Sequence, residues 1–91
     1  MELTDKIAET TWRSQPSLTE RVGELYMSHR EEIYRFVVAQ GVPPPTAQDI
    51  TQEVFLKLLG TLSDGRKIES ELAWLYRVAA NRATEDRKSV V

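Results

Sequence analysis

The 91-residue sequence has no cysteine, a single histidine and no long apolar run. The lack of cysteine excludes a disulfide framework and a thiolate metal site. One histidine, His29, is too little for a histidine-based metal centre. Spanning a bilayer takes roughly 20 consecutive apolar residues, and a secretory signal needs a basic segment followed by an apolar one. The chain has neither, so we expect a cytoplasmic protein with no membrane insertion and no metal.

Signals for catalysis are also scarce. The four glycines are scattered, and none precedes a Lys-Ser or Lys-Thr pair, so there is no phosphate-binding loop. One histidine flanked by helix-surface residues does not build a Ser-His-Asp set. Glu31 and Glu32 are adjacent, and on a helix they project about 100° apart, which excludes a catalytic carboxylate pair. We expect no enzymatic activity and no cofactor.

What the sequence does contain is helical periodicity. Its length supports one small domain. Apolar residues recur at three- and four-residue steps, and no stretch alternates with the two-residue period of a strand. We therefore predict an all-α fold, a compact bundle of three main helices. The segment before them, residues 1–16, supports at most a short N-terminal helix, which is marginal in water without packing. We interpret 1–16 as a flexible or loosely docked arm and 17–91 as the helical domain.

Three segments carry the main helices. The first begins near Ser17, which forms a capping-box pattern with Glu20, and Gly41 suits its C-terminal cap. Three prolines at 43–45 connect it to the second helix, which starts at the later prolines or at Thr46. The second helix runs to about residue 59, with Gly60 as its stop. A loop over 60–69 follows, and the third helix runs from about residue 70 into the 80s. On the first helix we interpret His29 as half-buried and hydrogen-bonded rather than as a ligand or base.

The second helix has two faces of different character. One is a regular apolar stripe, formed by Ala47, Ile50, Val54 and Leu58. A neighbouring face carries two carboxylates, an amide and a leucine, namely Asp49, Gln52, Glu53 and Leu56. Hydrogen-bond acceptors beside an apolar side chain suit docking against another protein. The alternative is a solvated face with one exposed leucine.

The basic residues concentrate at the C-terminal end. Residues 1–65 carry six basic and ten acidic groups, whereas residues 66–91 carry six basic and four acidic groups. Any contact with nucleic acid is therefore expected in the second part, although the total formal charge of −2 is unlike that of most nucleic-acid binders.

The third helix holds the residue types that such a contact needs. Basic side chains neutralise phosphates, the amide of Asn81 can read a base edge, and Trp74 or Tyr76 can stack on an unpaired base. Each has a structural alternative. Trp74 can serve as a core anchor, and Arg82, Arg87 and Lys88 interleave with Glu85 and Asp86, as on many solvated helices.

Two spaced blocks resemble a known family. The blocks are Asp49-Ile50-Thr51-Gln52-Glu53-Val54-Phe55-Leu56-Lys57-Leu58 and Trp74-Leu75-Tyr76-Arg77-Val78-Ala79-Ala80-Asn81, preceded by matching stretches at 24–26 and 31–37. Together they resemble region 2, the first domain of bacterial RNA polymerase sigma factors, and the extracytoplasmic-function type matches best. The similarity covers about residues 18–88.

The resemblance implies a subunit that directs core RNA polymerase to promoters in transcription initiation. In such proteins the second helix docks on the clamp helices of the polymerase's largest subunit. Here Asp49, Gln52 and Glu53 would make the polar contacts, with Phe55 and Leu56 supporting or extending the patch. An anti-sigma factor is a further partner that the family suggests.

The resemblance also implies contact with the non-template strand of the promoter −10 element, from which a base is extruded and captured. A base must leave its stack before its edges can be read in this way. The candidates are Arg66, Lys67, Arg77, Asn81 and Arg82, with Arg87 and Lys88 on backbone phosphates.

Five departures from the family pattern affect these expectations. Glu71 replaces an aromatic or leucine, Glu85 replaces an aspartate, and acidic residues dilute the basic end of the third helix. Pro43 stands where a serine cap is usual. The family's helix-turn-helix domain, which reads the −35 element, is absent from this chain. The alternatives to a sigma domain are therefore a helical module that binds polymerase or an anti-sigma factor without reading DNA, and an unrelated structural bundle.

Overall fold

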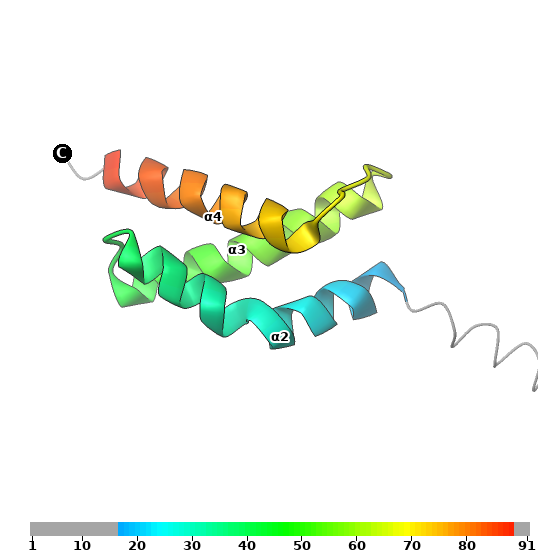
Figure 1. The fold of residues 1–91 in the computed structure, drawn as a ribbon, viewed down its shortest axis with the longest axis horizontal. Coiled ribbons are helices and arrows are strands. Elements are labelled where there is room, and N and C mark those ends of the chain that lie inside the picture. The colour runs from blue at the N-terminus through cyan, green and yellow to red at the C-terminus, as the bar shows by residue number, and fades with distance from the viewer. Residues whose placement is uncertain (1–16, 89–91) are drawn as a thin grey trace, which may run out of the picture.

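The structure is a computed structural model that describes residues 17–88, and these residues form three α-helices. They are α2 (Leu18–Ala39), α3 (Pro44–Ser63) and α4 (Glu71–Lys88). Figure 1 shows α2 and α4 running side by side in the same direction, with α3 crossing behind both in the opposite direction. The predicted all-α bundle of three main helices is confirmed for this part of the chain. The predicted arm at 1–16 lies outside the described residues.

The ends of α2 follow the predicted chemistry. The Ser17 hydroxyl accepts a hydrogen bond from the Glu20 amide at 3.1 Å, and the Glu20 carboxylate accepts one from the Ser17 amide at 3.0 Å, which completes a capping box. Beyond the last turn, Gly41 has φ +97°, a left-handed conformation that glycine adopts without a Cβ clash. The chain can therefore turn directly into the proline connector.

The prolines begin α3 as expected, because Pro43 is the N-cap residue and Pro44 and Pro45 occupy the first two helical positions. Thr46 consequently lies inside the helix and does not cap it.

The predicted end of α3 is wrong. Gly60 does not stop the helix, which continues to Ser63. The extra turn brings Leu62 against the core, and this packing outweighs the roughly 1 kcal/mol by which glycine disfavours a helix interior. The chain leaves the helix at Gly65 instead, whose φ of +84° is left-handed. The connecting loop is accordingly shorter than the predicted segment 60–69.

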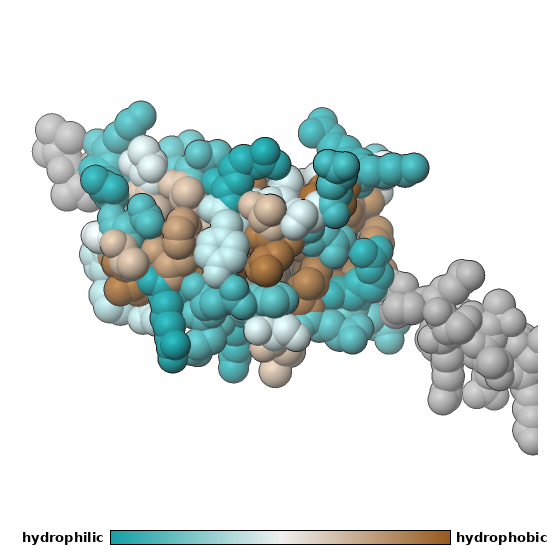
Figure 2. Space-filling view, viewed as in Figure 1, coloured by the Kyte–Doolittle hydropathy of each residue, from teal (hydrophilic) through white to brown (hydrophobic). Residues whose placement is uncertain are grey.

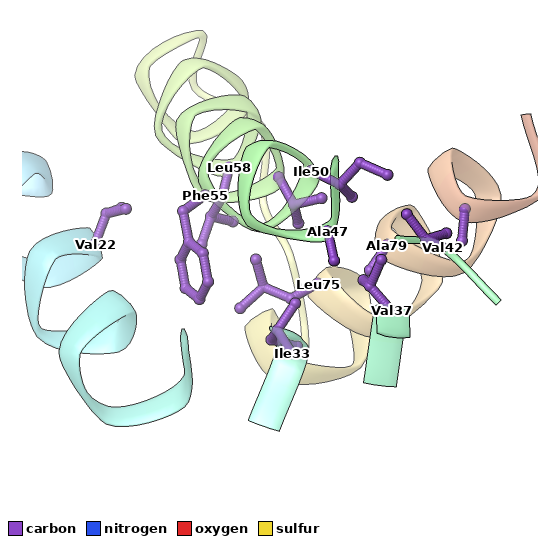
Figure 3. Packing of buried hydrophobic residues seen from close by; sticks show 12 residues of the cluster. Val22, Ile33, Val37, Val42, Ala47, Ile50, Phe55, Leu58, Leu75 and Ala79 are labelled. Atoms are coloured by element: carbon purple, nitrogen blue, oxygen red, sulfur yellow. The ribbon is translucent and has the colours of Figure 1, made fainter. Parts of the chain in front are cut away.

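The core lies where the three helices meet, and α3 contributes the largest share of it (Figure 3). Six of its side chains are the largest fully buried ones: Ile33 and Val37 from α2, Ile50, Val54 and Leu58 from α3, and Leu75 from α4. Burying a side chain of this size contributes about 1.5–3 kcal/mol. Ala47, Ala79 and Ala83 are also buried, and these small side chains allow the helix backbones to approach closely. The apolar stripe predicted for the second helix is confirmed.

Two aromatic pairs and three polar contacts connect the helices. Tyr26 of α2 meets Phe55 of α3 edge to face, with ring centroids 5.1 Å apart. Phe36 of α2 meets Tyr76 of α4 in the same way at 5.0 Å. Polar contacts between helices join Tyr76 to Glu32, Arg21 to Glu71 and Arg82 to Glu53.

One face of the molecule shows how polar and apolar side chains are distributed. Figure 2 shows apolar side chains along the line between α2 and α4, with hydrophilic side chains above and below that line. Among residues 17–88, no helix is both long and apolar enough to cross a membrane.

Candidate functional site

The unusual second face of α3 is exposed. Asp49, Gln52, Glu53 and Leu56 all lie on the surface, and we call these four residues the α3 face. Leu56 is 68% exposed, one of two large apolar side chains so exposed in residues 17–88. Ala47, Ile50, Val54 and Leu58 fill the opposite side and hold the helix in place. The α3 face therefore presents carboxylates, an amide and an isobutyl group together on a rigid helix.

Phe55 differs from the other residues predicted to bind the polymerase. Its ring is only 3% exposed and packs edge to face on Tyr26. It supports α3 from within the core, and its burial excludes a direct contact through this ring in the structure.

A polar hollow extends the α3 face onto α2. It is lined from α3 by Gln48, Thr51 and Gln52, and from α2 by Tyr26, Arg30, Glu31 and Tyr34. The Arg30 guanidinium lies over the Tyr26 ring, 5.6 Å from its centroid, and no ion pair to Arg30 forms within residues 17–88. A cation–π contact orders this group without neutralising it. Our sequence reasoning missed the contribution of α2, although the four-residue spacing of Tyr26, Arg30 and Tyr34 places them on one helix face.

A second hollow gathers three of the predicted nucleic-acid-binding residues. Arg66 and Lys67 from the loop meet Arg77 from α4 around it, and Trp74 forms part of the wall. Trp74 is half-buried and packs against the core, so it combines the predicted anchoring role with an accessible edge. We call this site the basic hollow. Glu69 also lines it, so three cations outnumber one carboxylate beside an aromatic ring, which suits a phosphate and a stacked base.

The other predicted contacts lie along α4. Asn81 is exposed one turn beyond Arg77 on the same face, and Arg87 and Lys88 are exposed in the last turn. Cations in that position also interact favourably with the negative end of the helix dipole. None of these three lines the basic hollow, so a ligand that reached them would have to extend along the helix.

Arg82 lies apart from this group. It is five positions from Arg77, about 140° around the helix. Its Nε and Nη2 donate to the two oxygens of Glu53 at 2.5 and 3.1 Å, and its Nη1 donates to Glu85 at 3.0 Å. The two carboxylates, Glu53 before Glu85, raise the pKa of the Arg82 guanidinium above its ordinary value. One residue predicted to bind DNA is thus paired with one predicted to bind polymerase, which the sequence spacing did not reveal.

His29 takes part in a small polar network. Its Nδ1 lies 2.6 Å from Oε1 of Glu32, and the hydroxyl of Tyr76 donates to Oε2 of the same carboxylate at 2.6 Å. These hydrogen bonds, that from His29 first, lower the pKa of Glu32, while the carboxylate raises the pKa of Tyr76. The half-buried, hydrogen-bonded histidine is confirmed. Within residues 17–88, no cluster of three or more histidine, aspartate or glutamate side chains could hold a metal ion.

Comparison with known proteins identifies the class to which this fold and these surfaces belong. The chain belongs to the sigma-70 region 2 family, whose model matches residues 25–89. It is similar to the ECF RNA polymerase sigma factor BldN of Streptomyces coelicolor, with 31% identity over 88 residues. The match covers 92% of this chain and 32% of that relative, so the chain spans about a third of the relative's length. No solved structure matches the chain significantly.

Proposed function

We propose that the chain acts as the region 2 domain of an extracytoplasmic-function sigma factor, in the cytoplasm, in transcription initiation. It would bind core RNA polymerase and promoter DNA, without enzymatic activity of its own. Membership of the family, together with the exposed α3 face within the matched residues, carries this proposal.

Docking on polymerase would use the α3 face and the adjoining polar hollow. The family suggests the clamp helices of the largest subunit as the partner. Asp49 and Gln52 are exposed and have no hydrogen bond to another side chain within residues 17–88, so a partner could bind them without breaking an internal contact. Leu56 would supply the apolar contact. An anti-sigma factor could bind the same face.

A binding assay with core RNA polymerase tests the docking. Asp49→Asn combined with Gln52→Ala should weaken binding by about tenfold or more, as expected when contacts at the centre of an interface are lost. These positions are preferable to Glu53, whose substitution would also disturb Arg82. Glu24→Gln is the control, because Glu24 is exposed on α2, about 200° around that helix from Tyr26. Equal binding by the double variant and the control would show that polymerase does not dock on the α3 face through Asp49 and Gln52.

Promoter contact would use the basic hollow and the Asn81 side of α4. The family suggests the non-template strand of the −10 element and capture of an extruded base. Arg66, Lys67 and Arg77 would hold phosphates, and Trp74 would offer a stacking edge. Affinity for a single-stranded −10 oligonucleotide should exceed that for a scrambled one at low salt, and Lys67→Gln with Arg77→Gln should lower both affinities. Equal affinities for the two oligonucleotides would exclude sequence recognition.

A specific observation favours a second candidate, a protein-binding module that does not read DNA. Arg82 is held by two carboxylates, and Glu85 and Asp86 dilute the basic end of α4. Under this alternative the docking experiment succeeds while the oligonucleotide experiment shows no binding at low salt.

A further inference from the structure

The contact between Arg82 and Glu53 links the α3 face to α4, the helix that carries the residues proposed to bind DNA. Glu53 belongs to the α3 face, one helical turn after Asp49 and next to Gln52. Arg82 belongs to α4, the helix that carries Arg77 and Asn81. The guanidinium binds both oxygens of Glu53 through Nε and Nη2, at 2.5 and 3.1 Å. Its remaining terminal nitrogen, Nη1, donates to Glu85 at 3.0 Å.

This geometry leaves Arg82 poorly placed to bind a phosphate in the free chain. Its donors point at two carboxylates, and the three charged groups together carry a net charge of −1. A phosphate that approached Arg82 would meet the repulsion of Glu53 and Glu85 before it gained the attraction of the guanidinium. In this arrangement Arg82 therefore adds little to the positive potential of α4.

The contact is also weak enough to be exchanged. The side chains of Arg82 and Glu53 are 31% and 49% exposed, and that of Glu85 is 66% exposed. Water and salt screen ion pairs in such positions, so their net contribution to the free energy is small. A partner that presents its own cationic donor to Glu53 needs only to exceed this small free energy.

We propose that Arg82 couples polymerase docking to DNA binding by exchanging its partner. A lysine or arginine of the polymerase that binds Glu53 releases the Arg82 guanidinium, which then binds a phosphate of the promoter strand. The proposal rests on the proposed function, because it needs both surfaces to be used. Coupling of this kind is reciprocal, so DNA bound at Arg82 also frees Glu53 for the polymerase.

The free chain provides the first test, with a labelled single-stranded oligonucleotide at low salt. Glu53→Gln should bind about two- to fivefold more tightly than wild type, because it weakens the hold on Arg82. The slope of log K against log salt should steepen by about 0.7, the value for one more phosphate contact on a single strand. Glu24→Gln removes the same charge from α2 and should change affinity much less. In the Arg82→Gln background, the gain from Glu53→Gln should fall to that of Glu24→Gln.

The complex with core RNA polymerase provides the second test. There Glu53 is already engaged, so Arg82→Gln should lower DNA affinity more than it does in the free chain. Arg35→Gln, which removes an exposed cation from α2, is the matched control.

Three results would overturn the inference. In the first, Glu53→Gln binds the oligonucleotide no more tightly than Glu24→Gln does. In the second, Glu53→Gln still raises DNA affinity in the Arg82→Gln background. In the third, Arg82→Gln lowers DNA affinity equally with and without polymerase. If wild type still binds DNA and polymerase in these cases, the proposed function stands. If no variant binds DNA under any condition, the DNA-binding part of the proposed function fails together with the inference.

Discussion

Tyr76 donates its phenolic hydrogen to the carboxylate of Glu32 at 2.6 Å, across 44 positions of sequence. The same carboxylate lies 2.6 Å from Nδ1 of His29 through its other oxygen. The Tyr76 ring meanwhile packs edge to face on Phe36. One tyrosine thus joins α4 to α2 through both an apolar and a polar contact. Neither Tyr76 nor Glu32 belongs to the α3 face or lines the basic hollow.

This network predicts a specific dependence of stability on pH. His29 and Tyr76 lower the pKa of Glu32 below its ordinary value of 4.5, so the ionised carboxylate stabilises the folded state. That stabilisation is present above pH 4.5 and is lost as the pH falls through the lowered pKa. The free energy of unfolding, measured with urea from pH 7 downward, should fall more steeply for wild type than for Glu32→Gln. Parallel curves for the two proteins would contradict the prediction, and Glu24→Gln controls for the loss of one carboxylate.

Replacement by alanine should have very different effects on stability at Leu56 and at Leu58. Leu58 is fully buried, and Leu58→Ala should lower the free energy of unfolding by about 2–5 kcal/mol, since it leaves a cavity. Leu56 is 68% exposed, so Leu56→Ala should change the free energy of unfolding by less than about 0.5 kcal/mol. Urea unfolding measures both. Leu56→Ala should nevertheless weaken binding to core polymerase, and unchanged binding would remove Leu56 from the docking surface.

Replacement by alanine should have opposite effects on stability at Gly60 and at Gly65. A Cβ at Gly60 would meet nothing within 4 Å, so Gly60→Ala should stabilise the protein by about 0.5–1 kcal/mol through higher helix propensity. Gly65 has equal space but a φ of +84°, so Gly65→Ala should destabilise it by about 1–2 kcal/mol. Thermal unfolding of the two variants checks the pair. A destabilising Gly60→Ala would show that α3 does not continue through this position.

The ion pair between Arg82 and Glu53 should contribute little to stability. Because both side chains are partly exposed, Glu53→Gln should lower the free energy of unfolding by no more than about 1 kcal/mol, and high salt should reduce the difference. Urea unfolding at low and at 1 M salt measures this. A loss several times larger would mean that changes in DNA binding by this variant reflect partial unfolding.

The helices were predictable because their signals are local. The capping box at Ser17, the left-handed cap at Gly41 and the apolar spacing of α3 each depend on residues within a few turns. The end of α3 was not predictable in the same way. A glycine such as Gly60 reads as a stop in isolation, whereas the packing of Leu62 against the core favours a helical last turn.

The candidate site was predictable to a lesser extent. Spacing along one helix identified the α3 face and placed Arg77 and Asn81 on one side of α4. It did not reveal contacts between helices, such as Arg82 with Glu53, or the polar hollow that Arg30 forms with residues of α3. The burial of Phe55 against Tyr26 could not be predicted from the sequence either, because it depends on how α2 and α3 cross.

The proline start of α3 has a consequence for hydration. The first four amides of a helix ordinarily need a side chain, water or a ligand. Here the cap and the first two helical residues are Pro43, Pro44 and Pro45, which have no amide hydrogen, and the Ala47 amide already donates to the Pro43 carbonyl at 2.8 Å. Only the Thr46 amide is left to be satisfied, so this helix start requires about one water molecule and loses little by lacking a serine cap. For the same reason it offers almost no donors to an anion, which makes the end of α3 nearest Asp49 unattractive to a phosphate.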